Sequence, residues 1–197
     1  MSSEKMDTRT RILESTWKLL ETGGGNSVRM SDIAKAAGVS RQAVYLHFPK
    51  RADLLVATTR HLDQVLNVDA RLEKSRHAET GVDRLTAFIE AWGNYIPEIH
   101  GVARALLAMK DTDSEAETAW NDRMQAVRHG CAAAVEAMKR DGDLCKDLSA
   151  RKATDLLWTL LSVRNWEQLR IDCGWSQSQY VQLMQSSARR LLIATTD

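Results

Sequence analysis

Apolar residues recur at spacings of three and four along most of this chain, and its 197 residues include only two prolines, Pro49 and Pro97. Average usage would supply about ten prolines at this length. Proline removes the N–H that a helix interior needs, so its scarcity permits long uninterrupted helices. No segment alternates apolar and polar residues as a half-buried strand does. The sequence therefore predicts an all-α fold of about nine helices.

Three helices are predicted before Pro49. The first carries one apolar stripe and is followed by Gly23–Gly25, which suit the backbone conformation at a helix end. Gly38 separates the next two helices, which are short, and Ser40 can cap the second of them. The predicted spans are about residues 7–21, 30–37 and 41–48.

Longer helices are predicted beyond Pro49. One is expected to continue from there as far as Leu72. Another begins near Leu85 and is expected to end near Pro97, because proline cannot continue a helix interior. The acidic segment that follows matches a capping box in two registers, so Thr112 or Ser114 is expected to cap the next helix. The last two helices are predicted over about residues 150–171 and 177–194, with Ser149 and Ser176 as their expected caps.

Residues 29–50 contain the most informative pattern, two short helices joined by a glycine turn, as in a helix-turn-helix. Ala34 and Ala37 are small where the helices cross, and Val39 and Val44 can fill the angle between them. In a DNA major groove, arginine pairs with guanine and glutamine with adenine, whereas hydroxyl groups and lysine suit phosphates. The candidate DNA-binding residues are Arg29, Ser31, Ser40, Arg41, Gln42, Tyr45, His47 and Lys50. The alternative is a helical hairpin that only packs against the rest of the chain.

The charge distribution favours the DNA-binding interpretation. The formal net charge of +1 hides an asymmetry, because residues 1–60 hold ten Lys and Arg against six Asp and Glu. Residues 61–197 hold seventeen against twenty. A basic excess at the end that carries the helix-turn-helix is the pattern expected of a nucleic-acid-binding region.

The segment IAKAAGVSRQAVYLHFPKRADLL resembles the TetR family of bacterial transcriptional regulators, over about residues 8–60. The resemblance rests on the Tyr-x-His-Phe pattern that closes the second short helix and on the lysine that follows. It implies that Lys50 is the usual phosphate-binding lysine and that the recognition helix carries Ser40, Arg41, Gln42, Tyr45 and His47. It further implies an all-helical homodimer that binds a near-palindromic operator, usually as a repressor, and is released when a small effector enters its C-terminal domain.

Two domains follow from this resemblance. Residues 1–50 are expected to form the helix-turn-helix DNA-binding domain, and residues 51–197 the ligand-binding and dimerisation domain. The last two helices are the candidate dimer interface, because their apolar residues cover too much of each helix for one buried side. These residues are Leu156, Leu157, Leu160, Leu161, Val163, Tyr180, Leu183, Met184, Leu191 and Leu192. The alternative is helices buried all round within one monomer.

Aromatic residues in the C-terminal part suggest a site for a small organic effector, since such sites combine apolar walls with a few polar groups. The candidate pocket residues are Phe88, Trp92, Tyr95, Trp120, Met124, Trp158, Ser162 and Trp166. The alternative is an ordinary aromatic core. The identity of the effector does not follow from the sequence.

No other chemistry is indicated. His129 and Cys131 lie on opposite sides of a helix, and the acidic segment near Asp113 lacks the glycine of a calcium loop, so neither a metal site nor a cofactor is expected. Three cysteines at wide spacings form no disulfide framework. No phosphate loop or nucleophile elbow is present, so the protein is not expected to be an enzyme.

The expected location is the cytoplasm, because the sequence has no secretory signal and no apolar run long enough to span a membrane. The favoured function is a ligand-responsive transcriptional repressor. Two alternatives stay open: an all-helical ligand carrier or enzyme that does not bind DNA, and an activator or constitutive regulator without an effector.

Overall fold

The computed structural model describes residues 7–23 and 28–194, and these residues form helices joined by short turns. The predicted all-α fold is confirmed. The chain divides into two compact units: the described part of Met1–Leu66 with Ile99–Arg123, and that of Asn67–Glu98 with Met124–Asp197. Two long helices, α6 (Gly81–Met109) and α7 (Ser114–Asp141), contribute residues to both units.

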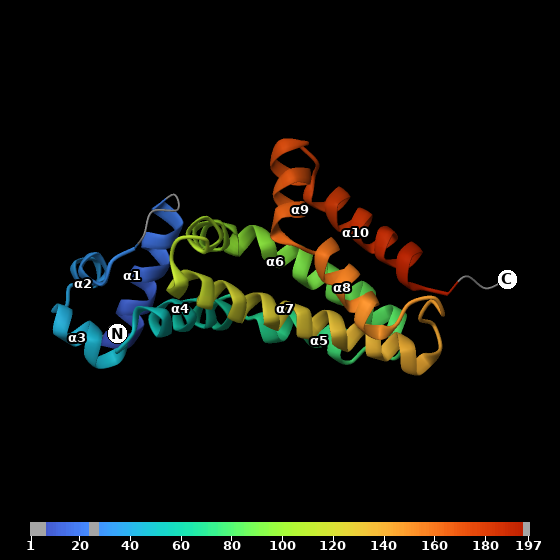
Figure 1. Cartoon of the computed structure of the whole chain (residues 1–197), viewed down its shortest axis with the longest axis horizontal. Helices are drawn as coiled ribbons and strands as arrows, with labels where there is room; N and C mark the ends of the chain where they lie inside the picture. Colours follow the sequence, from blue (N-terminus) through green and yellow to red (C-terminus); the bar gives the residue numbers. More distant parts are fainter. Residues whose placement is uncertain (1–6, 24–27, 195–197) are drawn as a thin grey trace, which may run out of the picture. The chain divides into compact units, whose positions relative to one another are not determined.

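The first unit is built around its N-terminal helices (Figure 1). Helix α1 packs against both α2 and α4, and α2 packs against α3. Buried apolar side chains from these helices, such as Ile12, Ile33, Val44 and Leu54, form one core with residues from the C-terminal end of α6 and the start of α7. The helices are α1 (Thr8–Thr22), α2 (Met30–Ala37), α3 (Arg41–His47) and α4 (Arg51–Val65).

The second unit contains the remaining helices together with the first part of α6 and the last part of α7. Its interior includes fully buried Leu85, Ile89, Met138 and Tyr180. Helix α6 begins so close to the end of α7 that a Cβ atom added to Gly81 would lie 2.3 Å from the backbone nitrogen of Met138. The further elements are α5 (Val68–Arg76), α8 (Ala150–Leu160), α9 (Val163–Glu167), the π-helical turn η1 (Gln168–Asp172) and α10 (Gln177–Leu192).

Several predicted helix boundaries are confirmed by the caps that the sequence suggested. Gly38 adopts the left-handed conformation, with φ of 63°, at the end of α2. The side chains of Ser40, Ser149 and Ser176 accept hydrogen bonds from the first turns of α3, α8 and α10. Gly23 follows α1 as predicted, whereas Gly24 and Gly25 lie outside the described residues.

Three predicted boundaries are wrong. The single helix predicted after Pro49 is α4 and α5, separated at Asn67, whose backbone is left-handed with φ of 55°. The helix predicted over residues 150–171 is interrupted because the Ser162 side chain accepts from the Asn165 amide and caps a new helix, α9. Asp113 caps α7 in place of Thr112 or Ser114, through hydrogen bonds from the Glu115 and Ala116 amides.

The fourth correction concerns Pro97, which lies inside α6 and does not end it. A proline at this position cannot donate to the carbonyl of Gly93, four residues earlier. The side-chain amide of Gln177 on α10 supplies that donor, with Nε2 2.8 Å from the Gly93 oxygen. Gln177 lies 84 residues beyond Gly93, so a local sequence pattern could not indicate that the helix continues.

Candidate nucleic-acid interface

The turn between α2 and α3 is fixed by backbone and capping hydrogen bonds. The Val39 amide donates to the Ala34 carbonyl at 3.0 Å, which returns the chain across the end of α2. The Ser40 side chain then accepts from the Ala43 amide at 3.1 Å and starts α3. Ala34, Ala37 and Val44 are buried where the two helices meet, so the predicted helix-turn-helix packing is present.

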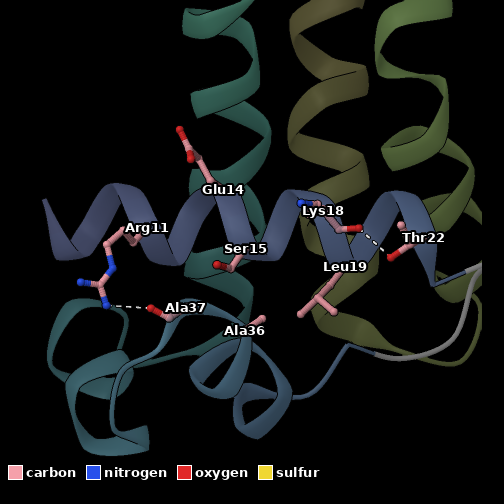
Figure 2. A pocket seen from close by; sticks show the side chains of 8 residues that line it. All are labelled: Arg11, Glu14, Ser15, Lys18, Leu19, Thr22, Ala36 and Ala37. Carbon is pink, nitrogen blue, oxygen red and sulfur yellow. Dashed lines mark hydrogen bonds between the residues drawn. The ribbon is translucent and has the colours of Figure 1, made fainter. Parts of the chain in front are cut away.

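Arg11 on α1 adds a contact that the sequence did not indicate. Its Nη2 atom donates to the Ala37 carbonyl at 2.7 Å and to the Gly38 carbonyl at 3.1 Å. Figure 2 shows this side chain extending from α1 towards the end of α2. Both acceptors are carbonyls left free at the end of α2, and Arg11 therefore holds the turn in place. In the sequence, Arg11 is one of many polar residues on α1, with nothing to distinguish it.

All eight predicted DNA-binding side chains belong to exposed residues. Arg29 precedes α2 and Ser31 lies in its first turn, while Lys50 directly precedes α4. The others lie on α3 or cap it. The structure thus leaves these polar groups free to contact a ligand as large as a DNA duplex, and the role of each residue stays a prediction. The residues are Arg29, Ser31, Ser40, Arg41, Gln42, Tyr45, His47 and Lys50.

Arg41 and Tyr45 form a pair on the exposed surface of α3. The guanidinium lies 5.5 Å from the centre of the tyrosine ring, and Nη2 is 3.4 Å from the hydroxyl oxygen. The hydrogen bond with Tyr45 raises the pKa of Arg41, so this side chain keeps its positive charge. The pair presents a cation and a phenolic hydroxyl together, a combination suited to phosphate oxygens or to the edge of a guanine.

Leu46 is an exposed apolar residue on the same helix that the sequence reasoning missed. Its side chain is 77% exposed, more than that of any other large apolar residue described as exposed. The sequence could have predicted this exposure, because Leu46 lies two residues after Val44 and therefore opposite the buried side of α3.

Lys50 and Arg51, adjacent in sequence, have different surroundings. Lys50 is exposed at the start of α4. Arg51 is largely enclosed, and its Nε donates to the Val28 carbonyl at 2.6 Å. Its Nη1 lies 2.7 Å from an oxygen of Asp113 at the start of α7. Glu115 accepts from the Ala52 amide at 3.1 Å, so the start of α7 also caps the start of α4.

The same two helices are joined further along by a second group of charges. Arg60 pairs with Asp122 at 2.8 Å, and Arg123 pairs with Asp63 and with Asp122. Burial acts to raise the pKa of Asp122, but the hydrogen bonds and charges of the two arginines outweigh it and lower that pKa.

Asp113 also has a lowered pKa. Burial would raise it, but the Ala116 amide, Arg51 and the Glu115 amide donate to the carboxylate and outweigh that effect. Asp113 is therefore held ionised in two roles, as the cap of α7 and as the partner of Arg51.

An open groove of about 560 Å³ runs between α1 and α2 in the first unit (Figure 2). Small and apolar side chains, including Leu19, Ala36 and Ala37, alternate with the charged groups of Arg11, Glu14 and Lys18. None of the predicted effector-pocket residues lines it.

The predicted effector-pocket residues are divided between the two units. Trp120 packs against the core of the first unit. Phe88, Trp92, Tyr95 and Trp166 are buried in the second unit, whereas Met124, Trp158 and Ser162 are half-buried there. The pocket itself stays a prediction.

Two of the buried tryptophans are fixed by hydrogen bonds. Trp92 donates to the Leu161 carbonyl at 2.8 Å. Trp166 donates to the Gln177 side-chain oxygen at 3.1 Å, and Gln177 in turn donates to Gly93. These contacts tie α9 and α10 to α6, and they use polar groups that an effector could otherwise have contacted.

Tyr180, which the sequence placed in the candidate dimer interface, is buried within the second unit. It is fully buried, and its hydroxyl has no hydrogen-bond partner among the residues that the structure describes. Burial raises its pKa, so the hydroxyl stays protonated and can donate. A buried hydroxyl without a partner is costly, and such groups usually meet a ligand or an ordered water.

The candidate dimer-interface residues separate into two sets. Six of them, for example Leu157 and Tyr180, are buried within a single chain and are not available for a second copy in this conformation. Leu156 and Leu191 are 43% and 51% exposed, and Leu160 and Leu183 are half-buried. The six buried residues are Leu157, Leu161, Val163, Tyr180, Met184 and Leu192.

The three cysteines are free, and within residues 7–23 and 28–194 no group of His, Cys, Asp and Glu could hold a metal ion. Burial raises the pKa of Cys131 to about 12, so its thiol is not activated. None of the described helices combines the length and hydrophobicity needed to cross a membrane.

Comparisons with known proteins agree with this geometry. Residues 12–58 match the model of the family described as bacterial regulatory proteins, tetR family. The chain is 28% identical over 159 residues to the HTH-type transcriptional regulator EthR of Mycobacterium tuberculosis H37Rv, which covers 77% of this chain and 70% of EthR.

Solved structures share the fold over nearly the whole chain. The transcriptional regulator FadR from Bacillus subtilis in complex with stearoyl-CoA superposes with a TM-score of 0.73 at 16% identity, covering 91% of this chain and 96% of FadR. NalD, the secondary repressor of the MexAB-OprM multidrug efflux pump in Pseudomonas aeruginosa, gives a TM-score of 0.66 at 23% identity, with coverages of 94% and 96%. The similarity to both extends beyond the helix-turn-helix.

Proposed function

Because this chain belongs to the TetR family of bacterial regulatory proteins and is a DNA-binding transcriptional regulator, we propose that it represses transcription as a homodimer on a near-palindromic operator. A small organic effector would release it. Residues 1–50 would contact DNA, and residues 51–197 would dimerise and bind the effector.

The observation that carries this proposal is the exposed polar surface of α3 on a rigidly held turn. Gln42, Tyr45 and His47 are exposed, whereas the turn behind them is fixed by Arg11 and by the Ser40 cap. A seven-residue helix contacts too few base pairs to define a unique site. Two copies, about 34 Å apart on one face of the duplex, would specify a palindrome.

The second copy would be bound through α8 and α10. Leu156 on α8 and Leu191 on α10 are exposed, and α8 and α10 contact each other within one chain. Two such pairs packed around a two-fold axis would form a four-helix bundle.

The effector would bind within the second unit. The unpaired hydroxyl of buried Tyr180 would supply one polar anchor, and Phe88, Trp92, Tyr95 and Trp166 are also buried in this unit. FadR, which shares this fold, was crystallised with stearoyl-CoA. The effector acts only if it binds the DNA-incompatible conformation more tightly, and a tenfold difference corresponds to about 1.4 kcal/mol.

A gel shift with the DNA upstream of the protein's own coding sequence tests the DNA-binding part. A sequence-specific complex that weakens steeply with salt is expected, because several phosphates are neutralised. A helical carrier or enzyme that does not bind DNA would give no such complex.

Thermal unfolding against a panel of small organic molecules tests the effector part. A ligand of the folded state raises the midpoint by mass action, and a true effector also lowers the affinity for DNA. An activator or constitutive regulator without an effector would show neither change.

A further inference from the structure

We infer that Leu46 is a specificity-determining residue, which contacts the 5-methyl group of a thymine close to an adenine bound by Gln42. The inference rests on the proposed binding of α3 in the major groove. It adds an apolar contact to a surface that is otherwise polar.

The position of Leu46 on α3 supports the contact. Val44 is fully buried and marks the inner side of the helix. Gln42 and Leu46 each lie about 160° around the helix axis from Val44, on its outermost side. Arg41 with Tyr45, and Ala43 with His47, lie on the two flanks. In a groove that receives this helix, Gln42 and Leu46 are therefore the side chains that project furthest towards the bases.

The chemistry of Leu46 limits what it can contact there. A leucine side chain has no hydrogen-bonding group, so it cannot bind phosphate oxygens or the polar edges of bases. In the major groove, the thymine methyl is the apolar feature of the base pairs. At 77% exposure, Leu46 gains the full benefit of leaving water only when an apolar surface covers it.

The spacing of the two residues predicts the arrangement of their bases. Residues four apart on a helix are displaced by about 6 Å along its axis, and successive base pairs by about 3.4 Å. For a helix whose axis follows the groove, the thymine contacted by Leu46 would thus lie one or two base pairs from the adenine contacted by Gln42.

The test uses the full-length protein and duplexes selected from a random-sequence library. Each thymidine of the selected half-site is replaced in turn by deoxyuridine, which keeps base pairing and removes only the methyl group. We expect one position, the same in both half-sites, where replacement lowers affinity about fourfold per half-site, since one buried methylene-sized group contributes about 0.8 kcal/mol.

Variants identify the residue responsible. Leu46→Ala is expected to lose this sensitivity to deoxyuridine while keeping its affinity for non-specific DNA. Val65→Ala, which truncates an exposed apolar residue on α4, is the matched control and should behave as the wild type. Thermal unfolding checks that the Leu46→Ala substitution leaves the stability of the protein unchanged.

Two results would overturn the inference. In the first, the wild type selects a palindrome but no thymidine methyl matters. In the second, Leu46→Ala keeps the wild-type response to deoxyuridine. If the wild type selects no sequence at all, the proposed function fails and the inference falls with it, so the two failures are distinguished.

Discussion

Lys50 and Arg51 are adjacent cations with different roles. Lys50 is exposed, whereas Arg51 is enclosed by Asp113, Glu115 and the Val28 carbonyl. The charge of Arg51 is therefore committed to joining α4 with α7, and the charge of Lys50 is available to a phosphate. The sequence alone does not distinguish the two.

Substituting each residue separates these roles. Lys50→Ala is expected to weaken binding to all DNA sequences and to reduce the salt slope by about one per protomer, with a stability change within about 0.5 kcal/mol. Arg51→Met is expected to destabilise the fold by about 1.5–3 kcal/mol, because its charge-assisted hydrogen bonds are lost. Urea unfolding and DNA titrations at several salt concentrations measure both effects. Equal stability losses in the two variants would contradict the assignment.

Asp113 makes the stability of the folded state depend on pH. Its pKa is lowered in the folded state from an ordinary value of 3.8. The folded state therefore binds that proton less readily than the unfolded chain, and the stabilisation is present above about pH 5 and lost as the pH falls below 3.8. Asp113→Asn should be less stable than the wild type at pH 7, and the difference should shrink below pH 4. A difference that stays constant between pH 7 and pH 3 in urea unfolding would exclude this role.

At the scale of the element, α6 depends on a residue distant in sequence. Pro97 leaves the Gly93 carbonyl without its helical donor, and Gln177 supplies one at 2.8 Å. Gln177→Ala is expected to cost about 1–3 kcal/mol, because a buried carbonyl loses its partner. In a Pro97→Ala background the restored backbone N–H should donate to Gly93, so the same substitution should cost less.

A double-mutant cycle measures this coupling by urea unfolding. The Trp166 side chain loses its Gln177 acceptor in both backgrounds, so that contribution cancels. A coupling of at least about 0.5 kcal/mol is expected for groups that share one hydrogen bond. Identical costs in the two backgrounds would show that Gln177 does not replace the missing donor.

The sequence predicted which segments are helical better than it predicted the residues at which the helices begin and end. Periodicity and local caps are short-range signals, which explains why the helix-turn-helix and the caps at Ser40, Ser149 and Ser176 were found. The continuation of α6 through Pro97 depends on a tertiary contact, and the break at Asn67 depends on a left-handed residue other than glycine. Neither leaves a periodic signal.

In the candidate nucleic-acid interface, too, some residues could be predicted from the sequence and others depend on contacts between distant parts of the chain. Exposed polar residues on α3 could be predicted because they lie away from the buried side of the helix, which Val44 marks. Arg11 could not, since its role depends on reaching carbonyls 26 and 27 residues away. Leu46 was missed although its position two residues after Val44 places it on the outer side of α3, because the candidate DNA-binding residues were chosen for their polar groups.

At the scale of the whole molecule, the proposed dimer depends on exposed leucines of α8 and α10. Leu156→Asp with Leu191→Asp is expected to give a folded monomer, because two charges would be buried at the interface without partners. Light scattering at micromolar concentration measures the mass, and circular dichroism checks the fold. Val65→Asp, at another exposed apolar position, is the control. A wild type that is monomeric in this measurement would contradict the dimer.

The central claim is that two copies of α3 bind one palindromic duplex in adjacent major grooves. The most direct test is a fluorescence-anisotropy titration of the selected duplex, with non-specific DNA as competitor, at several salt concentrations. The expected result is two protomers per duplex, binding at least about 10³-fold tighter than to non-specific DNA. Affinity should fall linearly on a log–log plot against salt. Equal affinity for selected and non-specific duplexes would contradict the claim.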